Sequence, residues 1–251
     1  MDLRGQRILV TGASRGIGAA IARRLLEDGA QVALHYNSSR QEAEGVLRGY
    51  EDQGVLLPAN LADPDRTRDL FENALKALGH LDALVLNAGV FLPHPIEEEL
   101  DQWWAVWKRT LAINLDAPGL LTQMALRHFQ AHGGGGRLIY IGSRAAFRGE
   151  TREFLGYAAS KGGLTSLARS VARSFGKDNV KSFVIAPGFT RTAMADTFVK
   201  EYGEQRLLDE IALNTLTLPE DIAPLTAFIC SGQMDHATGT VIDINAGSYM
   251  H

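Results

Sequence analysis

Cysteine is almost absent from this sequence, because its 251 residues include only Cys230. A single cysteine excludes an intramolecular disulfide, and its place in the apolar run AFIC predicts a buried, unreactive thiol. The chain also lacks a run of about 18 apolar residues, the length that a membrane-spanning helix needs. Its N-terminus, MDLRGQRILVTG, lacks the apolar stretch of a signal peptide. We therefore expect no membrane contact and a location in the reducing cytoplasm.

An excess of positive charge is missing too. The chain has 25 Lys and Arg against 29 Asp and Glu, so no basic field attracts nucleic acid. The seven histidines are scattered along the chain, which does not favour a metal site. The G-x-x-x-x-G-K-[ST] phosphate loop does not occur.

Short apolar runs alternate with segments whose apolar residues recur at helical spacing. The runs predict strands at residues 7–11, 31–36, 55–60, 81–87, 137–143, 180–186 and 240–245. Helices are expected at about 16–29, 40–53, 64–78, 97–131, 153–176 and 219–231.

Strict alternation of strand and helix implies a parallel sheet with right-handed crossovers and helices on both faces. No repeat, linker or shift in composition marks a second domain, so we expect one α/β domain over residues 1–251, a doubly wound sheet of Rossmann type with about seven parallel strands. Residues 187–217 form a long connection after the sixth strand, and we expect them to act as a substrate loop or lid.

The segment TGASRGIG at residues 11–18 closes the first predicted strand and opens the first helix. Its glycines permit a tight turn and close approach of a pyrophosphate, and the helix N-terminus offers unpaired N–H groups. This context predicts a dinucleotide site formed by Gly12, Ser14, Arg15, Gly16, Ile17 and Gly18.

The spacing TGxxxGxG resembles the short-chain dehydrogenase/reductase family, and the likeness extends over essentially the whole chain. The further matching positions are Asn87-Ala88-Gly89, Asn114, Ser143, the YAASK segment from Tyr157 to Lys161, and Pro187-Gly188. Within the family, the PGFTRTAM segment and the ending NAGSYM are most similar to 3-oxoacyl-[acyl-carrier-protein] reductases.

The resemblance implies roles for individual residues. Tyr157 would transfer a proton, Ser143 would hydrogen-bond the substrate oxygen, and Lys161 would hold the nicotinamide ribose. Asn114 would help to hold a water chain behind the lysine. The remaining cofactor positions are Asn60 and Leu61 beside the adenine, Asn87, Ala88 and Gly89 on the adenosine side, and Pro187, Gly188, Thr190 and Thr192 beside the nicotinamide. Asn60 departs from the family, which commonly has an acidic residue there.

Tyr157 and Lys161 are four residues apart, which places both side chains on one face of a helix. An ordinary tyrosine has a pKa of about 10, and a nearby lysine and an oxidised nicotinamide ring would lower that pKa. In the reducing direction Tyr157 would donate its proton to the developing alkoxide while the cofactor delivers hydride. The sequence therefore predicts an oxidoreductase that interconverts a ketone and a secondary alcohol.

The preferred cofactor is predicted from residues 35–40, HYNSSR, which end the second strand without an acidic residue. A carboxylate there would accept a hydrogen bond from the ribose 2′-OH and repel a 2′-phosphate. We therefore expect NADP(H) rather than NAD(H), with Arg15, Asn37, Ser38 and also Arg40 available to the phosphate. The alternative for Arg15 is a merely solvated side chain.

The substrate is left open by the sequence. The alternatives to a 3-oxoacyl reductase are a dehydrogenase of a sugar, polyol, steroid or other free small alcohol, and a non-catalytic dinucleotide sensor on the same fold. An intact set of Ser143, Tyr157 and Lys161 counts against the sensor.

Binding of an acyl carrier protein is also left open. The two arginines with which such reductases dock the carrier fall at Gly134 and Asp178, and Lys177, Arg137 and Arg173 are the neighbouring substitutes. We hypothesise that a free small ketone is the better substrate. The expected substrate contacts are Ser143, Arg144, Tyr157 and Gly188. Arg144, Arg148 and Arg152 either bind a small anionic substrate or are solvated loop arginines.

Three tryptophans, Trp103, Trp104 and Trp107, lie on the predicted long helix. We expect them to be buried against the core or against another subunit. Because members of the resembled family pair such helices, the expected assembly is a homodimer or homotetramer.

Overall fold

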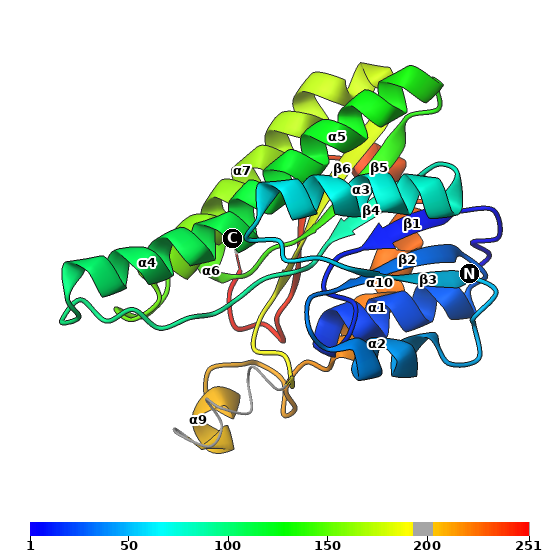
Figure 1. The fold of residues 1–251 in the computed structure, drawn as a ribbon. Coiled ribbons are helices and arrows are strands. Elements are labelled where there is room, and N and C mark those ends of the chain that lie inside the picture. Colours follow the sequence, from blue (N-terminus) through cyan, green and yellow to red (C-terminus); the bar gives the residue numbers. More distant parts are fainter. Residues whose placement is uncertain (193–202, 251) are drawn as a thin grey trace.

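The computed structural model describes residues 1–192 and 203–250, and within them seven parallel strands form one sheet with helices on both faces (Figure 1). The strands are β1 (Arg7–Val10), β2 (Gln31–Tyr36), β3 (Gly54–Pro58), β4 (Ala83–Leu86), β5 (Gly136–Ile141), β6 (Val180–Pro187) and β7 (Val241–Ile244). The helices are α1 (Gly16–Glu27), α2 (Arg40–Leu47), α3 (Pro64–Leu78), α4 (Leu100–Leu111), α5 (Ala117–His132), α6 (Ala145–Arg148), α7 (Leu155–Phe175), α9 (Glu204–Leu208) and α10 (Pro219–Cys230).

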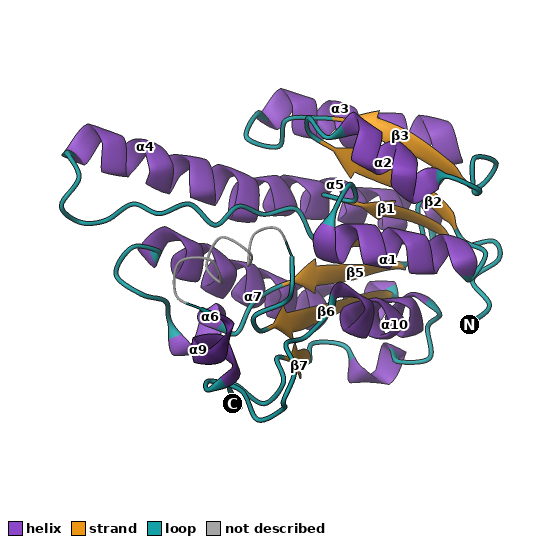
Figure 2. Ribbon diagram, turned by 90° about the horizontal axis from the view of Figure 1, so that it is seen from below, coloured by secondary structure: helices purple, strands orange, loops and turns teal. Residues whose placement is uncertain are grey.

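The strand order is β3-β2-β1-β4-β5-β6-β7. Helices α1, α2 and α10 cover one face of the sheet, and α3, α5 and α7 cover the other (Figures 1 and 2). Successive side chains alternate between the two cores: Ile8 and Val10 pack beneath α1, whereas Leu9 packs on the opposite side. The expected doubly wound α/β domain is thereby confirmed.

The order of the strands reverses between β1 and β4, and this reversal positions the functional site. From β1 the chain winds outward to β2 and β3, and it then returns to β4 on the other side of β1. Loops that leave two such strands separate above the sheet and open a crevice at their carboxyl ends. Thr11, which follows β1, donates its N–H to the carbonyl of Val85 in β4 at 3.0 Å.

The predicted helix over 97–131 is interrupted. Helix α4 begins only at Leu100, so the acidic run at residues 97–99 precedes the helix instead of forming its first turn. A π-helical turn, Ala112–Asp116, separates α4 from α5. Helix α2 is also shorter than expected and ends at Leu47, shortly before Gly49 adopts a left-handed φ of 85°.

Helix α4 projects beyond the sheet (Figure 1) and carries the three tryptophans. Their rings stack on one another, with centroids 5.2 Å apart for Trp103 and Trp107. Trp104 is 47% exposed, so burial within this chain is wrong for that residue. Burial against another subunit stays a prediction.

Other expectations about single residues are settled by burial. Cys230 is fully buried, and burial raises the pKa of its thiol to about 12, which confirms an unreactive cysteine. None of the helices in the described ranges is long and apolar enough to cross a bilayer. The described part of the chain holds no group of three potential metal ligands. The description of the histidines as scattered is wrong for one pair: the sequence HFQAH at residues 128–132 has H-x-x-x-H spacing, and the rings of His128 and His132 lie one turn apart on α5 with centroids 4.2 Å apart.

Candidate active site

The glycine loop between β1 and α1 depends on conformations that only glycine adopts easily. Gly12 and Gly16 have φ values of 67° and 55°. A Cβ atom on Gly18 would lie 2.1 Å from the carbonyl oxygen of Gly12, so no larger residue fits there. No side chain at the N-cap of α1 caps its N-terminus, and its first turn has no acidic residue. Its N–H groups therefore fit the pyrophosphate of a dinucleotide.

Asn87 fastens this loop to the end of β4. Its Nδ2 donates to the carbonyl oxygens of Thr11 at 2.9 Å and Gly12 at 3.1 Å. In return, the hydroxyl of Thr11 accepts hydrogen bonds from the backbone N–H groups of Asn87 at 2.9 Å and Ala88 at 3.0 Å. The loops after β1 and β4 thus form one hydrogen-bonded unit.

His35, at the end of β2, supports the loop from the other side and was missed by the sequence analysis. Its Nδ1 accepts the N–H of Gly12 at 3.0 Å, so Nε2 carries the proton and donates to the carbonyl of Ala59 at 3.1 Å. Burial lowers the pKa of His35 to about 4, which keeps the ring neutral. No signal in the sequence connects this histidine to partners more than twenty residues away.

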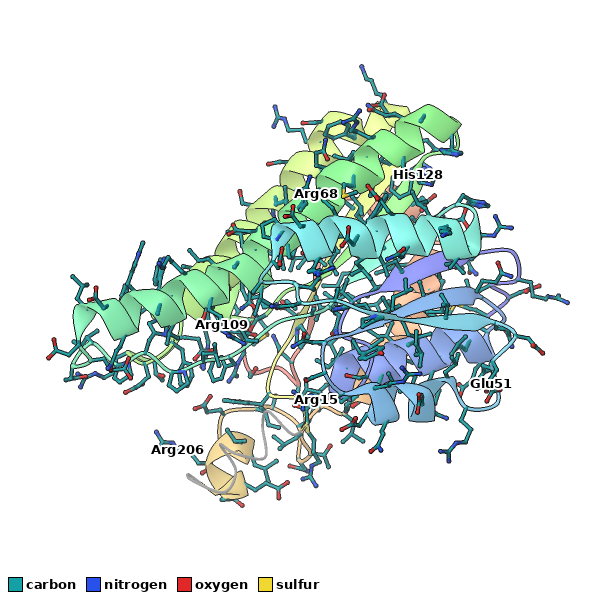
Figure 3. The ribbon with its side chains drawn as sticks, in the orientation of Figure 1. Arg15, Glu51, Arg68, Arg109, His128 and Arg206 are labelled. Carbon is teal, nitrogen blue, oxygen red and sulfur yellow. The ribbon has the colours of Figure 1, made fainter. Side chains whose placement is uncertain are left out.

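The residues expected to bind the 2′-phosphate are exposed and lie at or beside the glycine loop. Ala13 donates its N–H to the carbonyl of His35 at 2.8 Å, which sets the glycine loop beside the end of β2. Arg15, Asn37 and Ser38 are exposed there, and Figure 3 shows Arg15 at the end of α1. Arg40 instead forms an ion pair with Glu44 at 2.8 Å.

The expected adenine contacts differ in burial. Asn60 is exposed, and its side-chain oxygen accepts the N–H of Ala62 at 3.1 Å. Leu61 is buried among the residues of the core beneath α3 and α5. Of this pair, only the amide of Asn60 is therefore placed at the surface.

The segment that follows β6 lies next to the glycine loop that follows β1. A Cβ on Gly16 would lie 3.2 Å from Cγ2 of Thr192, so these two expected cofactor residues are neighbours. Gly188 packs against Asn245, where a Cβ would approach within 2.8 Å. Thr190 pairs with Thr217, which brings the two ends of the expected lid together. Residues 193–202 of that lid lie outside the described residues.

Three functional groups converge at the carboxyl end of β5. Tyr157 lies in the first turn of α7, close enough to Ser143 for the serine side chain to lower the pKa of the tyrosine hydroxyl. Lys161, one turn further along, places its Nζ 5.7 Å from the centroid of the Tyr157 ring and donates to the carbonyl of Ile141 at 2.8 Å. A hydroxyl pair backed by an ammonium group can hold a carbonyl oxygen and move a proton onto it.

The acidities in this chain differ from the expectation for the tyrosine. Burial raises the pKa of Tyr157 to about 12, although hydrogen bonding to Ser143 acts in the opposite direction. Burial also lowers the pKa of Lys161 to about 8. The lysine lies beside the ring and donates to Ile141, so in the chain alone desolvation of the phenol outweighs any help that Lys161 gives to the phenolate.

Asn114 lies in the π-helical turn, a distortion that often marks functional sites. Its Oδ1 accepts the N–H of Val90 at 2.8 Å, and its Nδ2 donates to the Val90 carbonyl at 2.9 Å and to the Ser160 hydroxyl at 3.1 Å. A Cβ on Gly89 would lie within 3.5 Å of both Asn114 and Lys161. Asn114 therefore ties the loop after β4 to the helix that carries the tyrosine and lysine.

His94 supports the same helix and was also missed by the sequence analysis. The N-cap of α7 is Phe154, which supplies no side-chain cap. The fully buried His94 takes that role, because its Nε2 accepts the N–H of Gly156 at 3.0 Å while its Nδ1 donates to the carbonyl of Leu92 at 3.1 Å. Gly156 directly precedes Tyr157, so His94 fixes the backbone beside the reacting hydroxyl.

Known proteins resemble this chain over its whole length. A family profile described as enoyl-(acyl carrier protein) reductase matches residues 12–249. The 3-oxoacyl-[acyl-carrier-protein] reductase FabG of Staphylococcus aureus is 33% identical and covers 96% of this chain and 97% of its own length. The L-rhamnose 1-dehydrogenase (NAD(P)(+)) of a Sphingomonas species is 31% identical, over 99% of this chain and 98% of that protein.

The fold agrees with solved structures as well. A short-chain dehydrogenase from Burkholderia cenocepacia J2315, determined in complex with NADP, superimposes with a TM-score of 0.89 at 35% identity over 99% of both chains. The matched residues 12–249 include the glycine loop, α7 and the segment after β6. We conclude that this chain is an oxidoreductase of the short-chain dehydrogenase/reductase family.

Proposed function

We propose that this enzyme reduces a free small ketone to a secondary alcohol with NADP(H), and that Tyr157 is the proton donor. The observation that carries the proposal is the convergence of the Ser143 and Tyr157 hydroxyls beside the Lys161 ammonium group. A bound nicotinamide dinucleotide would supply the hydride to the carbonyl carbon.

The chain's own groups then have distinct tasks. Ser143 holds the carbonyl oxygen, and Tyr157 gives that oxygen its hydroxyl proton as the alkoxide forms. A tyrosine whose pKa is raised to about 12 keeps its proton at neutral pH, which suits the reducing direction. Lys161 binds the nicotinamide ribose, and Gly89 lies beside its ammonium group.

NADP(H) is favoured by the groups around the expected 2′-phosphate. Residues 35–40 contain no carboxylate, and Arg15, Asn37 and Ser38 are exposed beside the glycine loop. The neutral His35 adds no charge of its own. Arg15 therefore supplies the positive charge that a 2′-phosphate needs.

A free substrate is favoured over a carrier-bound one. Gly134 and Asp178 occupy the positions of the docking arginines. Arg137, one of the neighbouring substitutes, forms a two-point ion pair with Asp235, with both N–O distances at 2.8 Å. That arginine is therefore committed within the chain. An acidic carrier protein would have to rely on the remaining pair of candidates, Arg173 and Lys177.

The second candidate is a sugar or polyol dehydrogenase working in the oxidising direction. It is favoured by the 31% identity to a protein named L-rhamnose 1-dehydrogenase, whose name also allows either cofactor.

Assembly as a homodimer or homotetramer is proposed as well. The exposed Leu100 and Trp104 on α4 make that helix the expected contact, and gel filtration with light scattering tests it.

The deciding experiment measures oxidation of NADPH and NADH with free ketones, with 3-oxoacyl groups on a short thiol and with the same groups on carrier protein. Sugars and polyols are assayed with NADP⁺ and NAD⁺.

We expect the highest kcat/KM with NADPH and a free ketone. In Tyr157→Phe we expect a loss of turnover of about 1,000-fold with cofactor affinity retained. Substantial turnover in Tyr157→Phe would refute its role. A preference for carrier-bound substrate that declines with salt would show that the carrier docks.

A further inference from the structure

Arg144 directly follows Ser143, and the structure decides between the two alternatives for it that the sequence left open. Its side chain is only 3% exposed, so it is not a solvated loop arginine. Its guanidinium carbon lies 4.6 Å from the centroid of the Phe189 ring. Its Nη2 donates to Oε2 of Glu210 at 3.2 Å, and its backbone N–H donates to the carbonyl of Pro187 at 3.1 Å.

One end of this buried guanidinium is unused. Nη1 of Arg144 is shielded from solvent and has no hydrogen-bond partner among residues 1–192 and 203–250. A guanidinium stays charged under all ordinary conditions and cannot relieve the cost by losing a proton. Buried donors in native proteins nearly always have an acceptor, so this charged donor calls for one beyond the described residues, and an anionic ligand would supply it.

The charges around Arg144 are unbalanced in the direction that attracts an anion. Arg148, the last residue of the short helix α6 that begins after Arg144, pairs with the same Glu210 oxygen at 3.5 Å. Glu150 is the other nearby acid, but burial raises its pKa and weakens it as a counter-charge. Two guanidinium groups therefore rely mainly on the carboxylate of Glu210, whose side chain is 41% exposed.

The unused donor belongs to the substrate side of the site. Arg144 adjoins the serine that faces the Tyr157 hydroxyl, and it covers Phe189, which follows Gly188. The charge of Glu150 acts on both Arg144 and Tyr157, so the two arginines and the proton donor lie in the same electrostatic environment. An anionic group of the substrate that is bound by Arg144 would therefore lie close to the reacting ketone.

We propose that Arg144, assisted by Arg148, binds the carboxylate of the substrate, so that the enzyme acts on a small oxo acid and not on a neutral ketone. Nη1 donates to the substrate carboxylate while Nη2 stays on Glu210, which holds the guanidinium in place over Phe189. A carboxylate offers an acceptor oxygen with a single negative charge, which suits the one guanidinium nitrogen that is left while Nη2 stays on Glu210. This inference rests on the proposed ketone reduction and adds the class of substrate to it.

The test compares each acid with its own neutral ester. NADPH oxidation is measured with 2-oxobutanoate, 3-oxobutanoate and 4-oxopentanoate and with the methyl ester of each. A charge-assisted hydrogen bond in a buried site corresponds to a preference of about 10- to 100-fold, so at least one acid should exceed its ester in kcat/KM by that factor. If every ester equals or exceeds its acid, the inference is wrong while ketone reduction stands.

Two variants and a matched control assign the preference to Arg144. In Arg144→Met, which keeps an apolar stem over Phe189, the ratio of acid to ester should fall to about one. In Glu210→Gln the KM of the acid should fall, because the guanidinium loses its competing carboxylate. Arg152→Met is the control: Arg152 is 57% exposed and pairs with Glu97, and its removal should leave the ratio unchanged.

The remaining outcomes also decide the matter. If Arg144→Met lowers turnover of acid and ester alike, the arginine supports the fold and the inference is wrong. If Arg144→Met does not fold, the wild-type ratio and the Glu210→Gln shift decide. If wild-type enzyme reduces no ketone with either cofactor, the proposed function fails. In that case, a rise in Tm with the three oxo acids that is absent with their esters supports the carboxylate site, and no rise overturns it.

Discussion

The two halves of the active site are held together by different kinds of interaction. Around the cofactor half, buried neutral groups such as Asn87 and His35 hydrogen-bond backbone atoms of the glycine loop. Around the substrate half, ion pairs of the buried Arg144 and of Arg148 with Glu210 join the region of α6 to the segment after α9. Hydrogen bonds between neutral groups depend little on salt, whereas an ion pair with a partly exposed member such as Glu210 weakens as salt rises. The two halves should therefore respond differently to substitution, to pH and to salt.

The largest test of the cofactor half is Gly18→Ala. The added Cβ would lie 2.1 Å from the carbonyl oxygen of Gly12, which is far shorter than a van der Waals contact, so the loop would have to move. We expect dinucleotide affinity to fall by about 100-fold or more, with a loss of stability of about 1–3 kcal/mol. Fluorescence titration with NADPH and urea unfolding measure the two effects.

Gly45→Ala is the control for this change, because nothing lies within 4 Å of a Cβ at that position in α2. That variant should bind NADPH normally and gain up to about 1 kcal/mol of stability from the better helix propensity of alanine. Normal NADPH binding by Gly18→Ala would show that the glycine loop can shift to accommodate the added Cβ, in spite of the hydrogen bonds from Asn87 and His35.

The second test uses pH, because His35 has its pKa lowered to about 4 from 6.5. Between these values the unfolded chain binds a proton at this residue and the native chain does not, so stability decreases as pH falls from 6.5 to 4. The loss attributable to His35 is about 3 kcal/mol. His35→Asn, which retains an acceptor for the Gly12 N–H, should lose that part of the pH dependence in urea unfolding. Equal slopes for the two proteins would contradict the buried, neutral assignment.

The smallest expected effect concerns the seam between the halves, where His94 caps the helix that carries Tyr157. His94→Phe keeps a ring against Trp103 but leaves the Gly156 N–H without an acceptor. We expect kcat to fall about tenfold with little change in the KM of NADPH. His94→Gln, which can place an oxygen near Nε2, should recover most of the loss. If both variants match wild type, His94 is only a packing residue.

Much of this molecule was predictable because its signals are local. The seven strands follow from short apolar runs, and the positions of Tyr157 and Lys161 follow from spacing on one helix. The break at Ala112–Asp116 had a local signal that the sequence analysis missed, because Pro118 has no N–H to donate to the carbonyl of Asn114 and disturbs the turn before it. What could not be predicted is that Val90 and Ser160, from other elements, hold the Asn114 side chain.

Charge and burial of single residues were the hardest to foresee. Arginine is rarely buried, so a solvated Arg144 was the ordinary expectation until its contacts with Phe189 and Glu210 were seen. The same holds for the tyrosine, whose acidity depends on how much apolar material surrounds its ring. Such quantities arise from packing between distant segments, which residue spacing does not encode.

The contact between Gly16 and Thr192 also has a consequence for biosynthesis. A nascent chain emerges from its N-terminus, so the glycine loop is available long before the segment after β6 has been made. The loop that this contact closes includes most of the protein, and its entropy must be lost before the contact forms. A truncated chain therefore has half of a nucleotide site. Because a ligand stabilises only the state that binds it, the cofactor protects finished molecules and leaves incomplete ones to proteolysis.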